Sequence, residues 1–441
     1  MVFSGYTLSG PSAPRRVLLI NLDRMRLARS LRAERALDLT VITNEENAHR
    51  YEGWRVGTVA DITDPVEVYT AALNLSGLQE FDHVITPLER CVIPAGMVRS
   101  RLGIQGMKYD EALGFANKFI MKKRIAQAGI PAAKFKLLPD GSMASRAGEI
   151  LGWPLVVKPL VGSGSQSTFW LRSARDADEF LGHAGTEGSA ARPVPMLAEQ
   201  AMDVIAEFHC DGIVQGGKVL FCVISQYFNP LIHRVGDFLG SFILDSGHPL
   251  HAEIEIIHHR SIEALGLVDG VTHLEVLRTP DRLLFGEIAC RPGGSGIPAN
   301  ITHKHGVDLW EAFLSLELGR QPTDIANQSV GPGSYQPGGM IQAWLGLPAR
   351  NGRITAMTSA TDFLAIPGVQ NVEMLYATGE EIVGSMATGF FAGHVFFTGQ
   401  DDADAYRIAQ RISSMYYIET ESADGVRRQW RAGDFAGDHK K

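Results

Sequence analysis

The sequence predicts a mixed fold of the α/β and α+β classes, with a parallel sheet near the N-terminus and antiparallel sheets after it. Strands alternate with helices from about residue 15 to 102, which is typical of a parallel sheet covered by helices. Further on, two hydrophobic strands around a tight turn, within residues 271–289, predict an antiparallel hairpin. Residues 339 to about 418 alternate short strands and turns and end in a helix, as expected for a small α+β subdomain.

The composition is that of an ordinary globular chain and restricts the kinds of partner. The 441 residues are 45% hydrophobic, enough for the cores of two or three domains. A formal net charge of −8 gives no general attraction for nucleic acid or an anionic membrane. The first sixteen residues lack the apolar core of a secretory signal, and no run approaches the roughly 20 apolar residues of a membrane span. We therefore expect a cytoplasmic protein with neither a nucleic-acid nor a membrane partner.

The spacing of the cysteines and histidines does not predict a metal site. No CxxC pair occurs, so neither a disulfide framework nor a zinc site is indicated, and the cysteines are expected to be small core residues. The paired histidines His258-His259 and His303-Lys304-His305 lack further ligands at a recognisable spacing. The four cysteines are Cys91, Cys210, Cys222 and Cys290.

The N-terminal sheet is predicted from three strands, VLLINL, LTVIT and HVITP, with helices between and after them. Neither GxGxxG nor GxxxxGK[ST] follows a strand, so a dinucleotide fingerprint and a P-loop are both missing. Glu89 lies just past the strand HVITP, at the edge where open α/β sheets bind ligands. A surface acid in a loop is the commoner explanation for such a residue.

A long helix is predicted from Asp110 to Ala128, because Gly129 stands at the expected C-cap and Pro131 follows it. Lys118 comes early in this helix, where a lysine is usually exposed. The basic cluster 122–124 is expected on the helix surface.

A second informative stretch runs from residue 151 to 171. A strand, PLVVK, ends at Lys158, a loop rich in glycine and serine follows, and a second strand, TFWL, returns. Such a loop lets backbone N–H groups and hydroxyls approach a phosphate, although a flexible turn is the more frequent role. A lysine in an apolar strand directly before the loop favours the phosphate interpretation. The loop residues concerned are Gly162, Ser163, Gly164 and Ser165.

The stretch LAEQAMDVIAEFHCDGIV, residues 197–214, carries two acids around an apolar segment, Glu199 and Glu207. In a nucleotide site, the backbone of such a segment could bind adenine while a nearby acid binds the ribose hydroxyls. Taken alone, the two acids indicate nothing.

The hairpin within 271–300 carries Glu275 and Glu287, one on each strand. They face each other only if the loop around Thr279–Arg282 holds an odd number of residues, such as 280–282. Two carboxylates in that position repel unless a divalent cation lies between them. Arg291 has the parity of Glu287 and would point into the same cavity. The alternative, a solvated face of an antiparallel sheet, is equally common for such glutamates.

Taken in order, these motifs resemble the ATP-grasp superfamily, in its carboxylate–amine ligase branch. The resemblance covers residues 15 to about 420, and the tail is similar to that of amino-acid ligases. It implies an N-terminal α/β domain at 1–108, an ATP-grasp region at 109–320 with a lid at about 133–198, and a C-terminal subdomain at 321–441.

The resemblance also implies the site. Lys118, Lys158 and the lid loop would contact the ATP phosphates, and Arg291 would steady the developing oxyanion. Adenine would lie at Glu199, Gln200 and Met202, with the ribose on Glu207. Glu275 and Glu287 would hold Mg²⁺, which Mn²⁺ could replace. Candidates for the substrate pocket are Glu89, Arg234, Arg291 and Lys304.

One position departs from the family pattern. The pattern E-x-N-x-R appears here as Glu287-Ile-Ala-Cys-Arg291, so Ala289 replaces the asparagine that helps to hold a second metal. Either one metal is held more loosely, or another residue such as Asn300 substitutes.

The function implied is an ATP-dependent carboxylate–amine ligase that forms an amide through an acyl phosphate and releases ADP and phosphate. Its substrates would be an amino acid or small carboxylic acid and an amine or amino acid. The alternatives are another acceptor, such as bicarbonate, a hydroxyl or a carrier-protein thiol, and a nucleotide-binding protein without catalysis. A homodimer is compatible with the fold class, but nothing in the sequence decides it.

Overall fold

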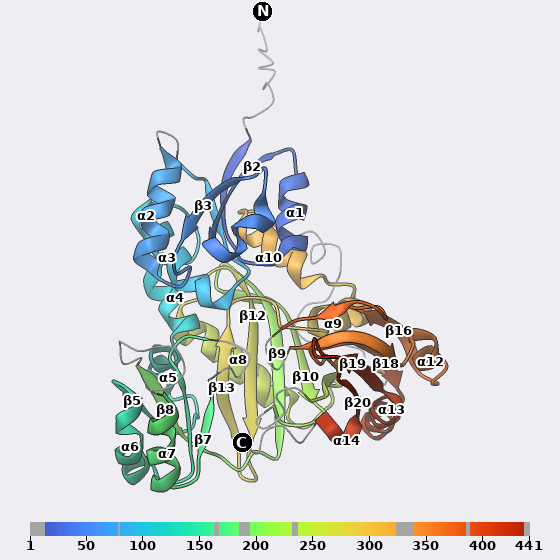
Figure 1. Cartoon of the computed structure of the whole chain (residues 1–441). Coiled ribbons are helices and arrows are strands. Elements are labelled where there is room, and N and C mark those ends of the chain that lie inside the picture. The colour runs from blue at the N-terminus through green and yellow to red at the C-terminus, as the bar shows by residue number, and fades with distance from the viewer. Residues whose placement is uncertain are drawn as a thin grey trace, which may run out of the picture. The chain divides into compact units, whose positions relative to one another are not determined.

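The computed structural model describes residues 14–77, 80–162, 167–184, 195–231, 237–322, 339–384 and 389–435. The chain divides into two compact units, Met1–Leu113 and Gly114–Lys441. Figure 1 shows the first unit in blue and the second from cyan to red.

The first unit contains a parallel sheet in the order β3-β2-β1-β4, which confirms the predicted parallel α/β fold. Strand β3 was not predicted, because its short sequence RVGTV lacks a long apolar run. The elements are β1 (Arg15–Ile20), α1 (Met25–Ala33), β2 (Leu37–Asn44), η1 (Glu45–Tyr51), β3 (Arg55–Val59), α2 (Pro65–Ser76), β4 (His83–Ile85), η2 (Glu89–Cys91) and α3 (Val92–Arg101).

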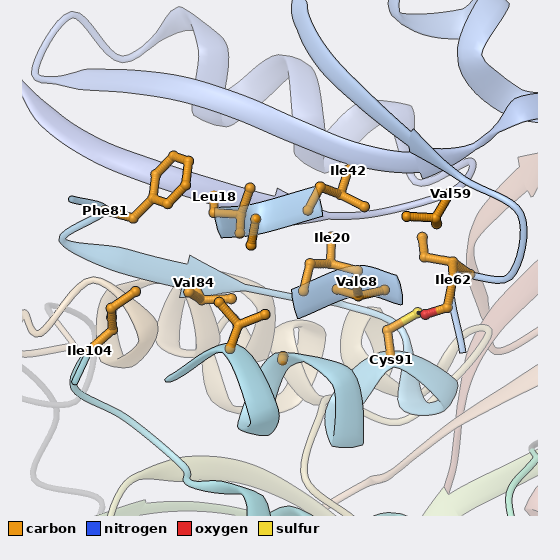
Figure 2. Packing of buried hydrophobic residues seen from close by; sticks show 13 residues of the cluster. Leu18, Ile20, Ile42, Val59, Ile62, Val68, Phe81, Val84, Cys91 and Ile104 are labelled. Carbon is orange, nitrogen blue, oxygen red and sulfur yellow. Dashed lines mark hydrogen bonds between the residues drawn. The ribbon is translucent and has the colours of Figure 1, made fainter. Parts of the chain in front are cut away.

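The core of this unit lies between the sheet and helices α2 and α3. Leu18 and Ile20 of β1 and Val84 of β4 point toward Val68 of α2 and Cys91 (Figure 2). These side chains are almost completely buried, as the runs of apolar residues in the strands predict.

The long helix predicted over 110–128 is instead two helices, α4 (Tyr109–Ala116) and α5 (Lys118–Gln127). Asn117 has an extended backbone, and its side chain accepts hydrogen bonds from the N–H groups of Phe119 and Ile120. An asparagine cap of this kind satisfies N–H groups that would otherwise be left unpaired, and so it starts a new helix. The break places Lys118 in the first turn of α5.

The second unit begins with a small antiparallel sheet in the order β5-β8-β6-β7. Helices α6 and α7 pack on it around a core that includes Leu155, Leu171 and Phe180. The elements are β5 (Phe135–Leu138), η3 (Gly141–Met143), α6 (Ala144–Leu151), β6 (Leu155–Pro159), β7 (Phe169–Leu171), α7 (Ala174–Ala184) and β8 (Met196–Gln200).

Among the described residues, the second sheet of this unit has eight strands, in the order β13-β12-β9-β10-β11-β14-β18-β16, and its neighbouring strands are antiparallel. Helix α8 packs against β9, β10 and β13, and α5 contacts both β13 and β5, so α5 links the two sheets. The elements up to α10 are β9 (Ala206–Gln215), β10 (Lys218–Tyr227), β11 (Leu239–Ile243), α8 (His251–Leu265), β12 (Gly270–Arg278), β13 (Leu283–Ala289), α9 (Ile297–His305) and α10 (Leu309–Glu317).

The C-terminal part contributes to two sheets. Three of its strands, β14, β18 and β16, extend the eight-stranded sheet, and four others form a separate sheet in the order β17-β15-β19-β20. The elements are β14 (Ile341–Pro348), β15 (Gly352–Met357), α12 (Ala360–Leu364), β16 (Val369–Met374), β17 (Glu381–Ile382), β18 (Phe391–Gly399), α13 (Asp402–Met415), β19 (Tyr417–Glu421), β20 (Arg427–Arg431) and α14 (Ala432–Phe435). Among the described residues, no helix is long and apolar enough to cross a membrane.

Candidate functional site

Glu275 of β12 and Glu287 of β13 lie directly opposite each other, as the sequence predicts. The predicted reason is wrong, because the loop between Arg278 and Leu283 holds four residues, an even number. The register instead shifts between Glu275 and Val276, whose partner is Phe285. One extra residue in β13, Gly286, forms a β-bulge, and this bulge restores the parity that the even loop would have removed.

Gly286 is required at the bulge because the strands approach closely there. A Cβ atom at Gly286 would lie 2.8 Å from the carbonyl oxygen of Glu275. A larger residue would push β12 and β13 apart at the point where the two glutamates face each other.

Glu287 forms ion pairs with two lysines from different elements. Its Oε1 lies 2.6 Å from Nζ of Lys118, at the start of α5, and its Oε2 lies 3.8 Å from Nζ of Lys158, on β6. The cap of α5 by Asn117 therefore matters to the site, because it sets the direction in which Lys118 leaves the helix. The large sheet supplies the acid, and α5 and the small sheet supply the cations.

Glu199 of β8 is the second acid that binds lysines. Its two oxygens lie 2.8 Å from Nζ of Lys122 and 2.8 Å from Nζ of Lys158. Lys122 was predicted on the helix surface, but it is 3% exposed and also donates to the carbonyl of Phe285. The signal that could have found it is its helical spacing of four residues from Lys118, which puts both on one face of α5.

The pKa values follow from burial and these ion pairs. Burial alone would raise the pKa of Glu199, but Lys122 and Lys158 outweigh it and lower that pKa to about 2. At Lys158, burial would lower the pKa, but Glu199 and Glu287 outweigh it and raise the pKa. At Lys122, burial outweighs the nearby acids and lowers the pKa. Lys158 and Glu199 are therefore charged near neutral pH.

The loop after Lys158 begins close to Lys118. Gly162 has φ of 155°, a backbone conformation that favours glycine, and its carbonyl oxygen accepts a hydrogen bond of 2.7 Å from Nζ of Lys118. The other three predicted loop residues, Ser163, Gly164 and Ser165, lie outside the described residues.

The segment predicted to receive adenine connects β8 to β9. Gln200 ends β8, where its N–H donates to the carbonyl of Lys134, and Met202 lies in the following stretch without regular structure. Glu207, at the start of β9, accepts a hydrogen bond from the N–H of Leu231. Burial, with the nearby charge of Glu275, raises the pKa of Glu207 to about 8.

A buried hydrogen-bonded chain that the sequence did not predict lies beside Glu275. Asp211 lies 2.5 Å from Nδ1 of His209 and 2.9 Å from Nδ1 of His273. Nε2 of His273 is 3.9 Å from Glu275, and Nε2 of His209 is 2.8 Å from the hydroxyl of Ser241. The two histidines lower the pKa of Asp211 despite its burial. Parity was the available signal, because these residues alternate with apolar ones on β9 and β12.

The described residues predicted for the substrate pocket lie on or next to different elements. Arg291 follows β13, donates to the carbonyl of Pro292 and lies close enough to His273 to oppose its protonation. Lys304, on α9, donates to the carbonyl of Met340. Glu89 belongs to the first unit, where it is buried at the start of η2, and Arg234 lies outside the described residues. Their part in substrate binding stays a prediction.

Residues 123–304 match the family described as the ATP-grasp domain. Over 410 residues the chain is 30% identical to an L-arginine-specific L-amino acid ligase of Bacillus subtilis, covering 91% of this chain and 97% of that protein. The chain belongs to the ATP-grasp family, in its carboxylate–amine ligase branch. This ATP-grasp protein is accordingly an ATP-dependent acid–amine ligase, an enzyme that forms C–N bonds.

Two solved ATP-grasp structures share its fold. An L-amino acid ligase from Bacillus licheniformis aligns with a TM-score of 0.69 at 16% identity, over 93% of this chain and all of that one. A carboxyaminoimidazole ribonucleotide synthase from Aspergillus clavatus, complexed with ATP, aligns with a TM-score of 0.64 at 18% identity, over 90% and 97% of the two chains. At these identities the likeness shows the fold alone, and it confirms the predicted ATP-grasp fold.

Proposed function

We propose that this ATP-grasp enzyme joins an amino acid or small carboxylic acid to an amine or a second amino acid, through an acyl phosphate made from ATP. One observation carries the proposal: Lys118 and Lys158 both contact Glu287, which lies opposite Glu275. Cations for the phosphates and a facing pair of acids for a divalent cation are thus gathered in one place.

The facing glutamates fit Mg²⁺, because a hard cation takes carboxylate and phosphate oxygens as ligands. Glu275 and Glu287 would hold it, and it would neutralise charge on the β- and γ-phosphates. In the free enzyme, Glu287 is neutralised by the two lysines instead. When the nucleotide binds, the lysines would turn to its phosphates while Glu287 turns to the cation, so that no charge is left unpaired.

The nucleoside part would bind between the small sheet β5-β8-β6-β7 and the eight-stranded sheet of the second unit. Adenine would lie against the segment around Gln200 and Met202, because strand β8 ends at Gln200 and Met202 follows without regular structure. Glu207 would accept hydrogen bonds from the ribose hydroxyls. Its raised pKa favours the neutral form in the free enzyme, and donors from the ribose would stabilise the charged form.

The chemistry begins with attack of the substrate carboxylate on the γ-phosphorus of ATP. The bond from this phosphorus to the β–γ bridging oxygen breaks, and ADP leaves. Amine nitrogen then attacks the acyl phosphate, phosphate leaves with the C–O bonding electrons, and the nitrogen gives up its proton. Lys118, Lys158 and the loop that starts at Gly162 would stabilise the transferring phosphoryl group, largely through charge and position.

Arg291 would stabilise the oxyanion of the tetrahedral adduct. It extends from the end of β13, where residues 287, 289 and 291 share a parity. Removing one such donor costs about 10²–10³-fold in rate in enzymes where this has been measured.

The first experiment is a screen for ADP release with amino acids in pairs, arginine included because the 30% identical relative is specific for it. ADP and phosphate should appear only when an acid and an amine are both present, and mass spectrometry should find the condensed product. Hydroxylamine in place of the amine should trap the acid as its hydroxamate. ADP release without any hydroxamate would contradict the acyl phosphate.

A matched pair of lysine variants tests the site. Lys158→Ala removes the cation shared by Glu199 and Glu287, and we expect turnover to fall at least about 10²-fold. Lys136→Ala changes an exposed lysine on β5 of the same sheet and should leave turnover unchanged. Equal activity of the two variants would refute the assignment of Lys158.

A further inference from the structure

Strand β9 has two faces with different chemistry. Glu207, His209 and Asp211 lie on the face of the proposed nucleotide site, so the intervening residues Cys210 and Gly212 lie on the opposite face. Helix α8 packs against β9 and β10. It covers this opposite face, because His258 of α8 lies against Gly212. The two faces are separated by the backbone of the sheet.

Two cysteines meet on the face under α8. Cys210 pairs with Ile224 and Gly212 pairs with Cys222 in the register of β9 and β10, so the cysteines are diagonal neighbours. Their sulfur atoms lie 3.1 Å apart. Neither cysteine forms a disulfide.

His258 of α8 fills the space above Gly212. A Cβ atom at Gly212 would lie 2.5 Å from Cε1 of the imidazole ring, so the missing side chain is what admits the ring. His258 is completely buried. The two sulfurs and a ring nitrogen of His258 all lie within 4.8 Å of one another.

The hydrogen bonds of His258 determine which nitrogen keeps a lone pair. Nε2 lies 2.8 Å from the hydroxyl of Thr272, and that hydroxyl donates to the carbonyl of Gly212. The hydroxyl has one proton, so it accepts from Nε2–H, and Nδ1 is left with its lone pair. Nδ1 is buried and has no hydrogen-bond partner among the described residues. A second group that orients the ring in this way is characteristic of histidines that bind metals.

We propose that Cys210, Cys222 and His258 form a binding site for a thiolate-preferring cation of the Zn²⁺ class, on the face of the sheet opposite the nucleotide site. The metal would bond to both sulfurs and to Nδ1, and the two thiol protons would pass to solvent. Tetrahedral zinc needs about 3.8 Å between sulfurs and about 3.6 Å from sulfur to nitrogen, so shifts of about 1 Å suffice.

The test uses the full chain, stripped with a chelator and kept reduced by a phosphine. Co²⁺ is the probe, because its thiolate complexes give an intense near-ultraviolet charge-transfer band that Mg²⁺ sites of oxygen ligands do not give. One equivalent of Co²⁺ should produce the band, and one equivalent of Zn²⁺ should abolish it. ATP and substrates are omitted, so the readout does not depend on ligase activity.

Variants assign the ligands. Cys222→Ala and His258→Ala should each lose the band, whereas Cys91→Ala, at a buried cysteine of the first unit, should keep it. Thr272→Val removes only the group that orients the ring and should weaken Co²⁺ binding about 10–100-fold. Thermal unfolding of each metal-free variant verifies that it is folded, and the graded effect of Thr272→Val tests the site if an alanine variant does not fold.

Three outcomes would overturn the proposal. The first is a wild-type chain that shows no charge-transfer band with excess Co²⁺. The second is a band that survives in the folded Cys222→Ala or His258→Ala protein. In the third, the reduced chain takes up no metal and air converts Cys210 and Cys222 into a disulfide, which would assign the pair to redox chemistry instead.

Discussion

The two faces of strand β12 have different surroundings, although the side chains that form them alternate along the same strand. Nε2 of His273 lies 3.9 Å from Oε1 of Glu275 on the face of the proposed nucleotide site, whereas Leu274 between them is completely buried on the other face. His273 and Glu275 lie beside hydrogen-bonding and charged groups, whereas Leu274 is surrounded by the core. Substitutions of neighbouring residues should therefore fail in different ways.

The largest effect is expected on the charged face. Glu287→Gln removes the charge that pairs with both Lys118 and Lys158, and turnover should fall by at least about 10²-fold in the ADP-release assay. Asp281→Asn, in the exposed loop of the same hairpin, is the control and should retain full turnover. A Glu287→Gln enzyme as active as the control would remove this glutamate from the site.

Adjacent residues of β12 provide the sharpest comparison. Leu274→Ala empties a packed position and should lower the free energy of unfolding by about 2–5 kcal/mol. Glu275→Gln should change it by less than about 0.5 kcal/mol while reducing turnover and the apparent affinity for Mg²⁺. Denaturant titrations and Mg²⁺-dependent ADP release measure the two quantities. If both variants lost mainly stability, the proposed division between the faces would be wrong.

A smaller effect is expected at the bulge that aligns the two faces. Gly286→Ala places a methyl group 2.8 Å from the carbonyl of Glu275, and the strain should cost about 1–3 kcal/mol of stability. Because the bulge sets the register, the Mg²⁺ concentration for half-maximal activity should rise as well. Gly433→Ala, where a Cβ would meet open space, serves as the control. An unchanged Mg²⁺ requirement would separate the bulge from the metal site.

The most gradual effect is a pH dependence of stability, of about 1.4 kcal/mol per pH unit. The pKa of Glu207 is raised from 4.5 to about 8 in the folded chain, so the folded state holds a proton that the unfolded state has lost between these values. The stabilising contribution is complete below about pH 4.5 and disappears as the pH rises through 8. Between pH 4.5 and 8, without nucleotide or metal, Glu207→Gln should make the slope of the unfolding free energy against pH less negative by the amount for about one proton. Glu263→Gln, at an exposed site on α8, should leave this slope unchanged. Identical slopes for both variants would contradict the raised pKa.

The prediction from sequence succeeded where the signal is local. Alternating strands and helices indicated the parallel sheet of the first unit. The apolar run PLVVK, which ends at Lys158 before a glycine-rich loop, indicated strand β6. The single long helix failed because one side chain, Asn117, offers its oxygen to two N–H groups and starts a second helix. Apolar periodicity continues across that break, so it does not reveal the cap.

Parts of the site could not be predicted because their partners come from distant segments. Lys122 was assigned to a surface, yet its charge is satisfied by Glu199, on a strand of the small sheet. Cys210, Cys222 and His258 show no ligand spacing along the chain, because two strands and a helix bring them together.

The sequence by itself determined which side chains could share a face, since strand alternation puts Glu207, His209 and Asp211 on one side of β9 and Cys210 on the other. It also determined the order of the motifs that mark the ATP-grasp family. Only the tertiary structure decided the register that sets Glu275 opposite Glu287, because the bulge at Gly286 depends on contact between two backbones. Charge pairing and close packing act through space, so the partners of Lys122 and His258 followed from the fold.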